Sequence, residues 1–100
     1  MSELRIMVED MSKGIEMARH YYESALFYKD VNMDFARKFA DMAKQQINNV
    51  TALHEMAVSC IKKAEEKGAQ ATEHMKQKWH EAHVDMMDEI KELEYKIGRI

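Results

Sequence analysis

The chain of 100 residues contains no proline, and the run from Ile15 to Lys67 contains no glycine either. Proline removes a backbone donor and glycine readily adopts a positive φ, so nothing in this run interrupts a helix. The only cysteine, Cys60, excludes an internal disulfide, and its place among apolar residues predicts a small buried side chain. Long, uninterrupted helices are therefore the expected secondary structure.

Other absences narrow the functional classes. The net charge is −3, and no third of the chain has a basic face, which argues against nucleic acid as a partner. No apolar stretch approaches the ~20 residues needed to span a bilayer, and the start lacks the apolar segment of a signal peptide. No glycine-rich phosphate loop, His-Glu-x-x-His motif, nucleophile elbow or EF-hand loop occurs. We therefore expect a cytoplasmic protein without a membrane partner, and we find no candidate for nucleophilic catalysis.

Apolar periodicity and capping residues divide the chain into three helices, at about 3–29, 34–67 and 71–98, within one domain of residues 1–100. Asn32 or Asp34 is suited to begin the second helix, and Gly68 is suited to follow its last turn. These features predict an all-α fold, an antiparallel three-helix bundle made of a long helical hairpin and a third helix. Because Lys29 and Asn32 continue the alternation of three- and four-residue spacings, one long helix with a polar gap in place of the hairpin remains open.

The second helix carries the most regular pattern, a series that alternates between spacings of three and four residues. Its members are Ala36, Phe39, Ala43, Gln46, Val50, Leu53, Ala57, Cys60 and Ala64. Only Gln46 is polar, so this series is predicted to pack against neighbouring helices, with Gln46 setting their register. Further apolar residues lie beside the predicted contact faces, namely Ile6, Met7, Tyr21, Phe27, Phe35, Met42, Met56 and Met87. A second copy of the chain would cover them, so we expect a homodimer.

Several imidazoles, carboxylates and amides have the spacing of ligand groups. His20 and Glu23 share a face of the first helix with Glu16, and His83 lies three residues after His80 on the third. Each group has two interpretations at this point, as metal ligands or as a solvated helix face. His54 is interpreted mainly as a hydrogen-bonded structural residue.

Two segments resemble ferritin-like proteins: residues 35–57 (FARKFADMAKQQINNVTALHEMA) resemble their second helix and residues 21–25 (YYESA) their first. In that superfamily, one helix supplies a glutamate and its neighbour a Glu-x-x-His pair to a di-iron site. The resemblance places Glu23 at the first-helix glutamate, whereas Gln46 and Asn49 stand in place of the glutamate and histidine. Because amides are weak neutral ligands, the resemblance implies the fold but argues against a standard di-iron site.

Two functions follow as expectations. The first is a non-catalytic assembly or interaction protein of ferritin-like character, which forms a homo-oligomer through long apolar helix faces or receives a protein partner, and which needs no cofactor. The second is a ferritin-like protein that binds iron or another divalent metal at a remodelled site. That site would use Glu23, His20 and His83 as ligands, with Gln46, Asn49 and His54 around them.

Overall fold

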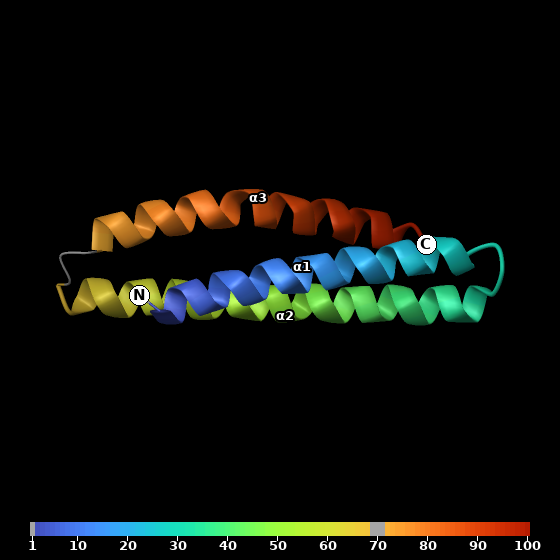
Figure 1. Ribbon diagram of the computed structural model, residues 1–100, viewed down its shortest axis with the longest axis horizontal. Coiled ribbons are helices and arrows are strands. Elements are labelled where there is room, and N and C mark those ends of the chain that lie inside the picture. Colours follow the sequence, from blue (N-terminus) through green and yellow to red (C-terminus); the bar gives the residue numbers. More distant parts are fainter. Residues whose placement is uncertain (1, 69–71) are drawn as a thin grey trace.

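The computed structural model describes residues 2–68 and 72–100, which form three helices: α1 (Ser2–Tyr28), α2 (Met33–Glu66) and α3 (Thr72–Gly98). The helices lie side by side in a rod of 56 × 17 × 16 Å, and each runs opposite to the one before it (Figure 1). The predicted hairpin is confirmed, and one continuous helix over the first two segments is wrong. The expected start of the third helix at residue 71 lies outside the described residues. None of the described helices is long and apolar enough to cross a membrane.

The ends of α2 follow the capping chemistry of the sequence. Asn32 has an extended backbone, and its side-chain oxygen accepts a hydrogen bond from the Phe35 backbone N–H at 3.2 Å. This bond satisfies one of the free donors at the start of the helix and ends the turn from α1. Gly68 has a φ of +67°, the left-handed conformation that stops a helix, and its N–H donates to the Glu65 carbonyl.

Small side chains fill the contact between α1 and α2. We call the following five buried residues the alanine seam: Ala18 and Ala25 on α1, and Ala36, Ala43 and Ala57 on α2. A close approach also occurs at Gly14, where a Cβ atom would lie 2.5 Å from Cγ2 of the fully buried Val50. Small residues allow the two backbones to come close together, so the bulky apolar side chains of both helices lie to either side of the seam.

The buried face of α2 is rotated from the predicted series. Ala36, Ala43, Val50 and Ala57 are buried as expected, but Phe39, Gln46, Leu53 and Cys60 are only half-buried, and in their place Ala40, Ile47 and Ile61 are buried. The prediction of a buried Cys60 is thus wrong. The physical reason is that α2 packs against two helices at once, so its buried arc extends toward α3 and leaves the opposite edge uncovered.

α3 covers one side of the hairpin with an apolar stripe. Met75, Trp79, Ile90, Leu93 and Ile97 are buried in the common core. Two ion pairs connect α3 to the hairpin. Arg19 on α1 pairs with Glu89 on α3, and Glu65 on α2 pairs with Lys76 on α3 at 3.0 Å. All four side chains are partly exposed, so these pairs orient α3 more than they stabilise it.

The close approach at Gly14 generates a stability prediction. Gly14→Ala should lower the free energy of unfolding by about 1–2 kcal/mol, because the overpacking cost against Val50 exceeds the gain of about 1 kcal/mol in helix propensity. In a Val50→Ala background the same substitution should instead stabilise. Urea unfolding of the four variants measures this coupling. Gly98→Ala is the control, because a Cβ there meets nothing within 4 Å; equal effects at Gly14 and Gly98 would contradict the close approach.

Candidate functional site

The side of the hairpin that faces away from α3 carries a long apolar surface. On α2, Ile47 lines a pocket with α3 residues and His54 contacts Trp79 of α3. Asn49 and Met56 each follow one of these residues by two positions, which is roughly 200° around an α-helix, so they lie on the opposite side. Phe35 and Met42 continue the same seven-residue spacing. This side therefore has no helix of the described chain packed on it.

We define the outer face as the residues on this side. It comprises Met7, Met17, Tyr21 and Tyr28 on α1, and Phe35, Phe39, Met42, Gln46, Asn49, Leu53, Met56 and Cys60 on α2. The large apolar side chains of Phe35, Met42 and Met56 are 48%, 41% and 51% exposed. Exposed large apolar residues gathered on one face are typical of an interaction surface.

Aromatic packing fixes the outer face near the turn between α1 and α2. The Tyr28 ring stacks on Phe39 with centroids 5.5 Å apart and meets the Phe35 ring edge-on at the same distance. Tyr21 lies on the other side of Phe39, with centroids 6.3 Å apart. Since aromatic pairs of this geometry restrain one another, this end of the outer face is preformed.

The middle of the outer face is polar. Gln46 and Asn49 lie near the midpoint of α2, and the Asn49 side-chain oxygen accepts a hydrogen bond from Gln45 Nε2 at 3.2 Å. The half-buried Gln46 side chain makes no hydrogen bond to another described residue. Each amide has both donors and an acceptor, so an amide at this place can pair with an identical amide.

A second cluster joins α2 to α3. The His83 ring lies parallel to Trp79 with centroids 4.5 Å apart, and His54 contacts both rings at 5.3–5.4 Å. His83 Nδ1 lies 2.7 Å from the Trp79 carbonyl oxygen, which can only accept, so Nδ1 carries the proton. Burial, reinforced by the neighbouring His83, lowers the pKa of His54, while Glu55 opposes the shift. His54 thus joins the packing of α3 in its neutral form.

The predicted metal ligands do not come together in one chain. Across residues 2–68 and 72–100, no group of three or more His, Cys, Asp or Glu side chains is arranged to hold a metal ion. His20 and Glu23 are exposed on α1. Arg19, next to His20, pairs with Glu89 of α3. His83 precedes Glu89 by six residues, so it lies roughly 9 Å along the bundle from the level of Arg19. His83 contacts His54 instead.

The ferritin-like ligand positions are also apart. Glu23 lies between Tyr21 and Tyr28, whose rings contact Phe39, so it is level with that part of α2. Gln46 lies seven residues further along α2, roughly 10 Å away. Glu23 also lines a pocket with α3 residues, whereas Gln46 and Asn49 belong to the outer face. Sequence spacing cannot show this mismatch, because it arises from the pairing of one helix with another.

The shifted pKa of His54 gives a second prediction. An unfolded chain binds a proton at His54 near pH 6.5, whereas the folded chain binds it only at lower pH, so this residue's contribution to stability is complete above pH 6.5 and is lost as the pH falls below it. The melting temperature of the wild-type chain should fall as the pH is lowered from 7.5 to 5. The melting temperature of His54→Gln should fall less over the same range. His20→Gln, on the exposed side of α1, should behave as wild type. Identical slopes for wild type and His54→Gln would contradict a lowered pKa for the half-buried His54.

Comparison of the chain with protein-family models, with curated proteins and with solved structures finds no match.

Proposed function

We propose that the protein is a non-catalytic helical assembly module whose outer face pairs with the outer face of a second copy. The observation that carries this proposal is the exposure of Phe35, Met42 and Met56 in a seven-residue series along the uncovered side of α2. A seven-residue apolar repeat is the pattern with which helices pack on other helices. Pairing two hairpins through this face gives the four-helix contact that a single chain lacks.

A twofold arrangement fits the distribution of residues along α2. In a twofold interface, residues near the axis meet their own counterparts, and residues at one end meet those of the other end. With the axis between Gln46 and Asn49, close to the midpoint of α2, Gln46 of each copy lies opposite Asn49 of the other. Phe35 and Phe39 then lie opposite Cys60 and Met56 of the second copy, and Met42 lies opposite Leu53.

The central amides then define the register. Amide side chains offer donors and acceptors to each other, and burial without a partner is costly. Sliding one hairpin along the other separates the amides and places them against apolar side chains, which disfavours the shifted pairings. A single polar position within an apolar interface selects register in this way in coiled coils, at some cost in stability.

Charge substitutions on the outer face test the proposal. Met42→Glu and Met56→Glu should each weaken the dimer at least about 100-fold, because an unpaired carboxylate would be buried at two places in a twofold interface. Both side chains are exposed in the single chain, so the free energy of unfolding of the monomer should change by no more than about 0.5 kcal/mol. Sedimentation equilibrium measures the association, with the chain mass of 11.8 kDa as reference.

The matched control is Val84→Glu, on the solvent side of α3, where the side chain is 37% exposed. This variant should associate as wild type does. A wild-type chain that sediments as a monomer would overturn the proposal, and so would a dimer that Met42→Glu and Met56→Glu leave intact.

A further inference from the structure

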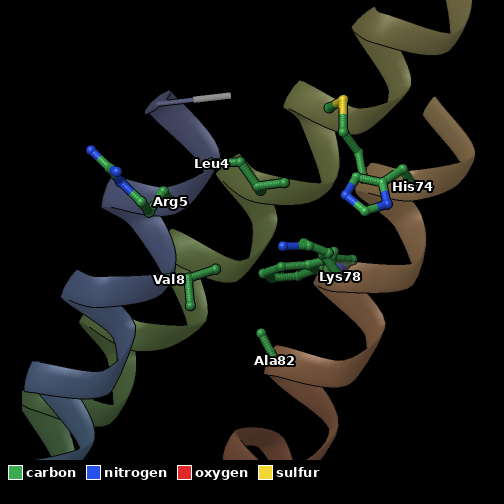
Figure 2. A pocket seen from close by; sticks show the side chains of 8 residues that line it. Leu4, Arg5, Val8, His74, Lys78 and Ala82 are labelled. Atoms are coloured by element: carbon green, nitrogen blue, oxygen red, sulfur yellow. The ribbon is translucent and has the colours of Figure 1, made fainter. Parts of the chain in front are cut away.

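A groove lies between α1 and α3, toward the N-terminal ends of both helices. Its volume is about 400 Å³, and its lining comprises Leu4, Arg5, Val8, His74, Met75, Lys78, Trp79 and Ala82. In Figure 2, Leu4 and Val8 on α1 and Ala82 on α3 point into the space between the two helices. Concave sites of this size with a mostly apolar lining and a few polar groups are typical of small-molecule binding.

The ionisable side chains that line the groove are all of basic residues. Arg5 lies on the α1 side, and Lys78 and His74 lie one turn apart on the α3 side. Arg5 is near Glu9 at 3.9 Å, a weak exposed pair. The neighbouring carboxylates of α3 have other partners: Glu73 lies near Lys76 and Glu81 accepts from Gln77. No ion pair of Lys78 occurs among the described residues. The groove therefore favours a ligand with an anionic group.

We propose that this groove binds a free, linear amphipathic anion, such as a medium- or long-chain carboxylate. The alkyl chain lies against Leu4, Val8 and Trp79, and the carboxylate faces Lys78. This ligand satisfies both properties of the lining, since apolar surface is removed from water while the anionic group remains at the cationic rim. The inference is independent of the outer face, because no groove residue belongs to that face.

Trp79 is the only tryptophan of the chain and lines the groove, so its fluorescence can report ligand binding. Dodecanoate, titrated below its micelle concentration, should change the Trp79 emission in a saturable manner. Shortening the alkyl chain should weaken binding by roughly fourfold per methylene removed. Dodecyltrimethylammonium, with the same chain and the opposite charge, should bind at least about fivefold more weakly.

Two variants separate the charge from the groove. Lys78→Gln should weaken dodecanoate binding about fivefold and leave the cationic analogue unaffected or bound more tightly. Ala82→Phe, which fills the groove from α3, should abolish the saturable change in emission with dodecanoate. Lys91→Gln, an exposed lysine of α3 outside the groove, is the control and should bind as wild type.

Circular dichroism of each variant establishes that the helices are intact before binding is compared. An unchanged Trp79 emission with dodecanoate would overturn the proposal. Equal affinity for the anionic and cationic ligands, or equal loss in Lys78→Gln and Lys91→Gln, would show nonspecific apolar adsorption and would overturn it too.

Discussion

The close contact between α1 and α2 is the constraint on which the rest of the structure depends. The alanine seam and Gly14 bring the two backbones together between Gly14 and Ala25 of α1. Alanine buries little apolar surface, so this contact alone removes only a modest area from water. The larger apolar side chains of both helices therefore lie beside the seam, on its two flanks. Each flank is an apolar surface that needs a covering element, and the hairpin by itself provides none.

α3 solves this problem on one flank. Trp79, Ile90, Leu93 and Ile97 cover the side chains beside the seam and complete a three-helix core. The opposite flank is the outer face, where Phe35, Met42 and Met56 stay exposed. A second hairpin placed there would do what α3 does on the other side. The dimer that we propose is thus a consequence of the small seam residues, and the central amides give that pairing its register.

Much of the fold is readable from the sequence because it rests on local signals. The absence of proline, the cap at Asn32 and the stop at Gly68 each act within a few residues, and the structure has the helix ends close to the predicted positions. Features that depend on how helices pair were not predictable in this way. The rotation of the buried face toward Ile47, and the separation of Glu23 from Gln46, follow from the contacts of α2 with two neighbours. The basic groove was missed for the same reason, because Arg5 and Lys78 resemble solvated helix residues until α1 and α3 are placed together.

Small-angle X-ray scattering of the wild-type chain tests the twofold pairing most directly, because it reports mass and length together. α2 runs along the rod, and an axis through its midpoint overlays the two copies side by side. The expected result is a mass about twice the 11.8 kDa of one chain, with a longest dimension that stays close to the 56 Å of the monomer. The mass of a single chain, or a particle about twice as long as the monomer, would contradict pairing through the outer face.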